Sequence, residues 1–61
     1  MSAMAGEVLV RRDGSGFVVE CVPPDPAHPS QVFDNMRTAW GFAGGIKLAT
    51  GRRKVDLTQG G

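Results

Sequence analysis

The sequence has few of the residues that small proteins use to bind metals or form cross-links. Only one of the 61 residues is cysteine and only one is histidine. The chain therefore has neither an internal disulfide nor a zinc-ligand set of its own. Secreted domains of this size usually depend on several disulfides. We expect a cytoplasmic protein that holds no metal and no cofactor.

Long apolar runs are also absent. No stretch approaches the roughly 20 apolar residues of a membrane-spanning helix, and the first six residues lack the basic and apolar regions of a signal peptide. We therefore expect no association with membranes. A chain of 61 residues makes one domain at most. We assign it to residues 1–61 and expect residues 1–6 and 58–61 to be flexible.

Groups suited to catalysis are sparse. The six acidic residues are dispersed along the chain, and a domain this short can hardly enclose a small-molecule substrate. The glycines before Lys47 lack the spacing and the following Ser or Thr of a phosphate-binding loop. A Cys21–His28 pair would need a reactive thiol, but strand alternation places Cys21 on the core face. The sequence predicts no enzyme and no catalytic residues.

Two β-rich runs, residues 7–12 and 17–22, flank the turn Asp13-Gly14-Ser15-Gly16. This pattern predicts a β-hairpin whose glycines supply the positive φ of the turn. Because side chains alternate along a strand, the charge at Glu20 assigns the opposite face to the core. The inward residues are then Val8, Val10, Phe17, Val19 and Cys21. The apolar residues left on the outward face are Leu9, Val18 and Val22.

The second half of the chain predicts a helix between strands. Residues 23–29 hold four prolines and form a surface loop, after which residues 31–33 could add a short strand. Asp34 stands at the expected N-cap, the helix begins near Asn35, and Gly51 stands at its C-terminal cap. Residues 52–57 alternate like a last strand. The apolar helix stripe is Met36, Ala39, Trp40, Ala43, Ile46 and Thr50, with Phe42 and Ala49 at its edge. The predicted class is α+β, in the order β-β-(β)-α-β, with the helix on one face of a small sheet.

Three glycines lie inside the predicted helix, where together they cost about 3 kcal/mol relative to alanine. Gly41, Gly44 and Gly45 fall on the side away from the apolar stripe, next to the outward Leu48. One interpretation is a continuous or kinked helix with a smooth strip that another backbone can approach. The other is a helix that breaks near Phe42.

The predicted core is thin for a domain without disulfides or metals. Burial of its side chains roughly balances the entropy lost on ordering the chain, so oligomerisation or docking onto a partner is expected. This argument favours a non-enzymatic protein-binding module, acting as a homodimer, an inhibitor or an accessory subunit. The expected partner-binding residues are Leu9, Val18, Val22, Gly41, Gly44, Gly45 and Leu48.

The charges are distributed unevenly and suggest an alternative. Residues 1–34 hold two basic and five acidic residues, whereas residues 35–61 hold five basic and one acidic. A basic half could contact phosphates, although the sequence pI is only about 8.0. The alternative is therefore a small nucleic-acid-binding regulator. Its expected contacts are Arg37, Lys47, Arg52, Arg53 and Lys54.

The order of these motifs resembles HicB-like antitoxin domains and similar short β-β-α proteins. The resemblance covers residues 7–50 and rests on Val8-Leu9-Val10, on residues 13–20, and on Phe33-Asp34 before a helix with Ala39 and Ala43. It implies a hairpin, a proline-containing loop, a helix, and inhibition of a partner protein. Asn35 stands where the family has a small hydroxyl residue, and the separate DNA-binding segment of such antitoxins is absent. No functional residue is carried over from the family.

Overall fold

Four strands and one helix make up residues 6–58, the part of the chain that the computed structural model describes. The elements are β1 (Glu7–Asp13), β2 (Gly16–Val22), β3 (Gln31–Phe33), α1 (Met36–Thr50) and β4 (Arg53–Asp56). The predicted α+β class and element order are confirmed, including the short third strand. Most residues of the two ends predicted to be flexible, 1–5 and 59–61, lie outside the described part.

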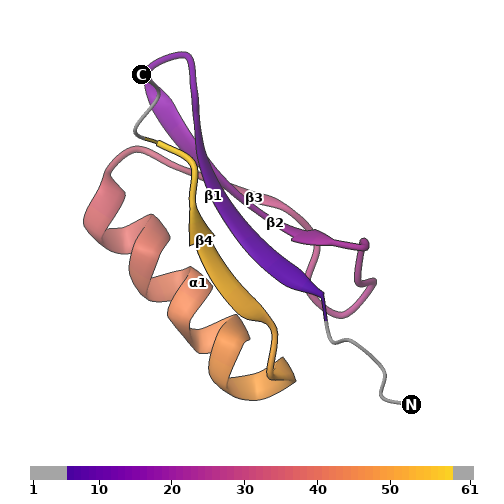
Figure 1. Ribbon diagram of the computed structural model, residues 1–61. Helices are drawn as coiled ribbons and strands as arrows, with labels where there is room; N and C mark the ends of the chain where they lie inside the picture. Colours follow the sequence, from indigo (N-terminus) through magenta and orange to yellow (C-terminus); the bar gives the residue numbers. More distant parts are fainter. Residues whose placement is uncertain (1–5, 59–61) are drawn as a thin grey trace.

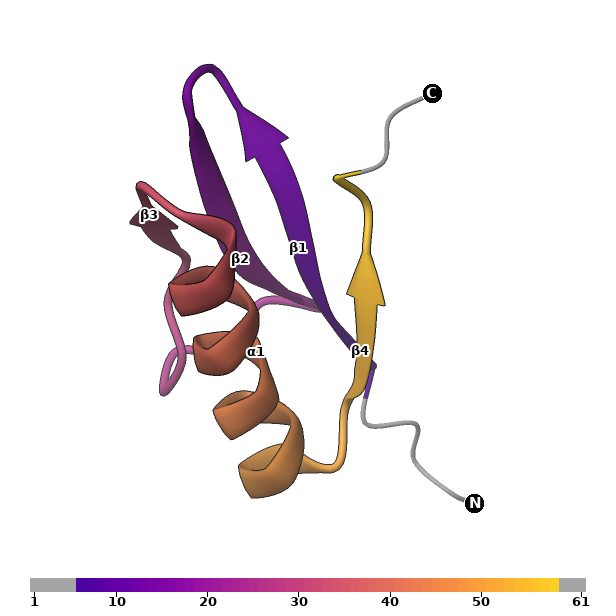
Figure 2. The ribbon, with the colours of Figure 1, turned by 90° about the vertical axis from the view of Figure 1, so that its left-hand side faces the viewer.

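The strands form one mixed sheet in the order β3-β2-β1-β4. β1 and β2 are antiparallel, as are β2 and β3, whereas β4 runs parallel to β1. The parallel pair arises because α1 carries the chain back along the sheet before β4 begins. α1 covers one face of the sheet (Figure 1), and the 90° turn shows β4 at one side of the molecule (Figure 2).

The hairpin turn is tighter than the four-residue loop read from the sequence. Asp13 and Gly16 already pair across the two strands, which leaves Gly14 and Ser15 as the turn. Gly14 has φ +64°, and the two-residue hairpin turns that are most favoured need a positive φ at their first central position. One glycine therefore supplies the positive φ that the sequence pattern predicted.

α1 is continuous through its three glycines, so the interpretation with a break near Phe42 is wrong. Its N-cap is Asn35 rather than the predicted Asp34, because the Asn35 side chain accepts a hydrogen bond from Thr38 N at 2.8 Å. Asn and Asp are equally good caps, so the sequence favours neither. Gly51 ends the helix at φ +78° and donates to the Lys47 carbonyl, as predicted.

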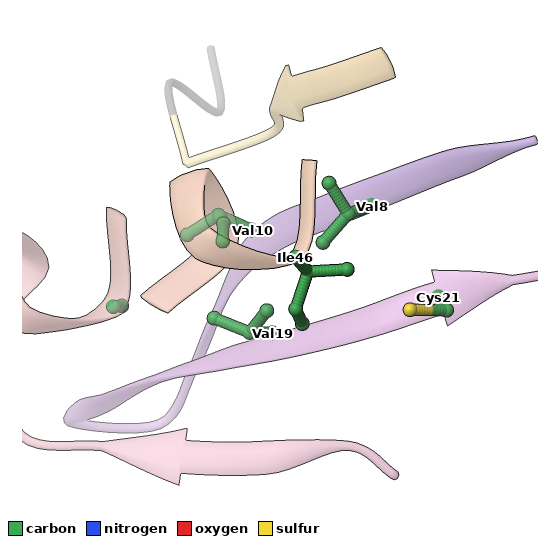
Figure 3. Packing of buried hydrophobic residues seen from close by; sticks show 7 residues of the cluster. Val8, Val10, Val19, Cys21 and Ile46 are labelled. Carbon is green, nitrogen blue, oxygen red and sulfur yellow. The ribbon is translucent and has the colours of Figure 1, made fainter. Parts of the chain in front are cut away.

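The core lies between α1 and the inner face of β1 and β2. Ile46 projects from the helix between Val8 of β1 and Val19 of β2 (Figure 3). Ala39 and Ala43 are fully buried, and their small side chains let the helix approach the strands closely. The predicted members Phe17, Phe33, Met36 and Trp40, together with Phe42, are only partly buried around this centre, and Ala49 is exposed.

Candidate interaction surfaces

The sheet face opposite α1, here called the outer face, carries six apolar side chains. The strand register places Leu9 beside Val55 and Val18 beside Val32 on this face. Its apolar members are Leu9, Val18, Val22, Val32, Val55 and Leu57. Val22, Val32 and Leu57 are exposed. This face is more apolar than the sequence predicted, because β3 and β4 each contribute to it.

Val18 does not lie open on the outer face as expected, because only 5% of it is exposed. The register sets Arg11 and Val32 directly beside it on the two neighbouring strands. Arg11 then reaches along β2 to Glu20, with Nε 2.9 Å from the carboxylate, so its side chain spans the strands next to Val18. A charge at Val18 would therefore disrupt the sheet, and Val22 and Val32 are the better probes of binding.

Two ion pairs separate the apolar groups of the outer face. One is Arg11–Glu20, and its hydrogen bond raises the pKa of Arg11 above the ordinary value. The other joins Arg53 of β4 to Glu7 of β1 at 3.0 Å. Both pairs are partly or largely exposed, so each contributes little to stability. The Arg11–Glu20 pair lies on the two central strands, so the exposed side chains of Val22, Val32 and Leu57 lie around it and not in one continuous apolar patch.

The glycines of α1 do not share one environment. A Cβ on Gly44 would lie 3.2 Å from Lys54 Nζ, whereas Gly41 and Gly45 have open space. The same ammonium group lies 3.9 Å from the centre of the Trp40 ring, a favourable cation–π contact. Gly44 thus leaves room for Lys54 to reach Trp40. Leu48 is 85% exposed, as predicted for the side of the helix away from the sheet.

Alanine at Gly41 or Gly45 is expected to stabilise the protein by about 0.5–1 kcal/mol each, because a helix interior disfavours glycine and nothing obstructs the new Cβ. Alanine at Gly44 should gain less, since its Cβ would displace Lys54. Urea unfolding of the three variants measures the difference. Equal gains in the free energy of unfolding at all three positions would show that the Lys54–Trp40 contact does not disfavour a side chain at Gly44.

The five basic residues proposed to contact nucleic acid do not share one surface. Arg53 lies on the outer face, whereas Lys54 lies on the helix side beside Trp40. Arg37 and Lys47 are exposed near opposite ends of α1. Arg52 is only 8% exposed. Nucleic-acid binding by this set stays a prediction, which a salt titration of binding would test.

Arg52 contacts three segments of the chain and links them to one another. Its guanidinium donates to the Glu7 carbonyl at 3.3 Å and lies 3.8 Å from the Asp25 carboxylate. Its backbone N–H donates to the Thr50 hydroxyl at the end of α1. These partners come from the start of β1, the proline-rich loop and the helix terminus. The structure therefore gives this buried arginine a role in folding.

Cys21 and His28 line the same depression, of about 190 Å³, although the sequence placed them in separate environments. Cys21 is nevertheless buried in the core, as predicted. Glu20 and Asp25 are also at the rim of this depression. Within residues 6–58, no three His, Cys, Asp or Glu side chains are close enough to hold a metal ion.

The Asp56 carboxylate accepts hydrogen bonds from the hydroxyl and the N–H of Thr58, at 2.6 and 2.8 Å. These bonds lower the pKa of Asp56. A lowered folded-state pKa adds stability above the unfolded-state pKa, and this contribution is lost as the pH falls through the folded value. Thr58→Ala should raise the pKa of Asp56 toward its ordinary value, and an NMR pH titration would show it. An unchanged pKa would contradict this origin.

Comparison of the chain with models of protein families, with curated proteins and with solved structures found no match. No helix in residues 6–58 is long and apolar enough to span a membrane. The surfaces described above are therefore the basis for a functional proposal.

Proposed function

We propose that this chain is a small non-enzymatic protein-binding module that acts as a homodimer, an inhibitor or an accessory subunit, and that it binds through its outer face. The observation that carries the proposal is a group of exposed apolar side chains on a sheet face that no other described element covers. Val22 and Val32 are 44% and 71% exposed, on neighbouring strands.

The composition of the outer face supports this proposal. Single exposed valines are common on protein surfaces, but here Leu9, Val22 and Val32 share one face with the apolar residues of β4. Ion pairs lie among them. Non-obligate protein interfaces mix apolar and polar groups in this way, and taken as a whole they are about as apolar as the rest of a protein surface. The resemblance to HicB-like antitoxin domains supports an inhibitor among the three forms, and the single free cysteine supports a cytoplasmic location.

Site-directed photo-crosslinking would test the proposed surface. A photoreactive amino acid placed at Val22 lies on the outer face, and one placed at Leu48 lies on the exposed side of α1. We expect crosslinks to a defined protein, or to a second copy, from Val22 and none from Leu48. Crosslinks from Leu48 alone would move the site to the exposed side of α1, and none from either position would overturn the proposal.

A further inference from the structure

β4 leaves one edge of the sheet open within the described residues. It is the last strand in the order β3-β2-β1-β4, and the other elements all lie on one side of it (Figure 2). The N–H group of Arg53 donates to the carbonyl of Gly6, just before β1, and that of Leu57 donates to the carbonyl of Val10 in β1. Because backbone groups alternate in direction along a strand, those of Lys54 and Asp56 point away from β1, toward the open edge.

We infer that β4 pairs with β4 of a second copy, as antiparallel strands related by a two-fold axis at Val55. A two-fold axis perpendicular to the sheet reverses the strand direction, so a symmetric pair of this kind must be antiparallel. The two sheets then continue into one, with both helices on the same face. The inference rests on the proposed protein-binding function and names the partner at this edge.

Charge selects this register. Lys54 and Asp56 carry the outward backbone groups, so they must form the hydrogen-bonded pairs with the second copy. An axis at Lys54 would place two lysines opposite each other, and an axis at Asp56 would oppose two aspartates. An axis at Val55 pairs Lys54 of each copy with Asp56 of the other. Opposite charges stabilise directly paired positions and like charges destabilise them.

Neither of these two side chains has an oppositely charged partner among the described residues. The ion pairs present are Arg11–Glu20, Arg52–Asp25 and Arg53–Glu7. Asp56 is hydrogen-bonded to Thr58, and Lys54 lies over Trp40. Lys54 is also on the helix side of the sheet, because it pairs with the inward Val8. Asp56 of the second copy would reach the edge on that same side.

The outer face contributes apolar contact at the same axis. Val55 of one copy lies opposite Val55 of the other, in the non-hydrogen-bonded type of pair, in which the side chains are closer together. Leu9 lies beside it on β1, and Leu57 is exposed one position beyond β4. An inward lysine on an edge strand usually discourages strand pairing. Here Asp56, two residues further on, supplies its complement in an antiparallel copy.

A charge-exchange experiment tests the inference. In Lys54→Asp both edge charges are acidic, and in Asp56→Lys both are basic, so each variant opposes like charges in its own dimer. We expect the wild-type chain to dimerise with increasing concentration in sedimentation equilibrium. The dimer of each variant should have a dissociation constant at least about tenfold higher than that of the wild type. An equimolar mixture of the two variants should form a heterodimer, because its pairs are again opposite in charge.

The double variant Lys54→Asp/Asp56→Lys supplies the matched control, since it restores opposite pairs within one chain and should dimerise again. Circular dichroism of each variant checks the fold, and the mixture tests the pairing even if Lys54→Asp loses stability with its contact to Trp40. A wild type that stays monomeric, or variants that neither lose nor exchange association, would overturn the inference. Crosslinking from Val22 tests the outer face separately, because Val22 is on β2, away from this edge.

Discussion

Replacing Ile46 with alanine is expected to lower the free energy of unfolding by about 3 kcal/mol, the largest effect of any substitution considered. Ile46 is 4% exposed and fills the space between Val8 and Val19 (Figure 3). Loss of this side chain removes its transfer free energy and leaves a cavity. In a domain this small, each kcal/mol shifts the melting temperature by roughly 4–8 °C. A fall of more than about 10 °C in a thermal melt is therefore expected.

Leu48→Ala is the matched control for Ile46→Ala. Leu48 lies two residues further along the same helix but is almost fully exposed. Its truncation should change stability by less than about 0.5 kcal/mol. Both variants are compared at one protein concentration, because self-association would make the apparent stability concentration-dependent. Similar losses at the two positions would contradict the orientation of α1.

Replacing Arg52 with alanine is expected to cost about 2 kcal/mol, because the charged hydrogen bond to Glu7 and the partly buried contact to Asp25 are lost together. The proline-rich loop should also become more mobile, since Asp25 is its charged attachment to Arg52. Urea unfolding measures the first effect. Amide exchange of His28, whose N–H donates to the Asp25 carbonyl within the loop at 2.9 Å, measures the second.

Arg53→Ala is the matched control, because it also removes one positive charge but removes no buried contact. Arg53 is the next residue, but its side chain is largely exposed and forms a surface ion pair with Glu7. Such pairs contribute about 0–1 kcal/mol. Equal effects of Arg52→Ala and Arg53→Ala would mean that the buried contacts of Arg52 do not hold the loop.

The local pattern of the sequence predicts most of the fold. Alternation around Glu20 identifies the inner face of the hairpin, and the spacing of Ala39, Ala43 and Ile46 identifies the face of the helix that packs on it. Gly51 marks the end of the helix correctly. These features depend on neighbouring residues, whose geometry is set by the period of a strand or a helix.

The pairing of distant segments is what the sequence does not reveal. Nothing near Arg52 indicates that Asp25 and the Glu7 carbonyl converge on it, so the sequence predicts an exposed basic residue where the structure buries one. The sequence predicts an open Val18 because alternation gives its face but does not reveal the neighbours, Arg11 and Val32, on the adjoining strands.

The same limitation applies to the candidate surfaces. Residues 52–57 look like a strand, but their position at the sheet edge and their parallel pairing with β1 follow only from the topology. The contributions of Val32, Val55 and Leu57 to the outer face depend on that topology as well. Exposed apolar residues in two short strands are a weak signal in the sequence, and the register is what places them together.

Binding of a protein by the outer face can be tested by quantitative affinity capture from the source cells with charge variants. Val22→Glu/Val32→Glu places charges on exposed positions of the outer face and leaves β4 unchanged, while Leu48→Glu places one on the far side of α1. We expect wild type and Leu48→Glu to retain the same stoichiometric protein and the double variant, still folded, to lose it. Retention by the double variant, or loss only with Leu48→Glu, would show that the outer face is not the binding surface.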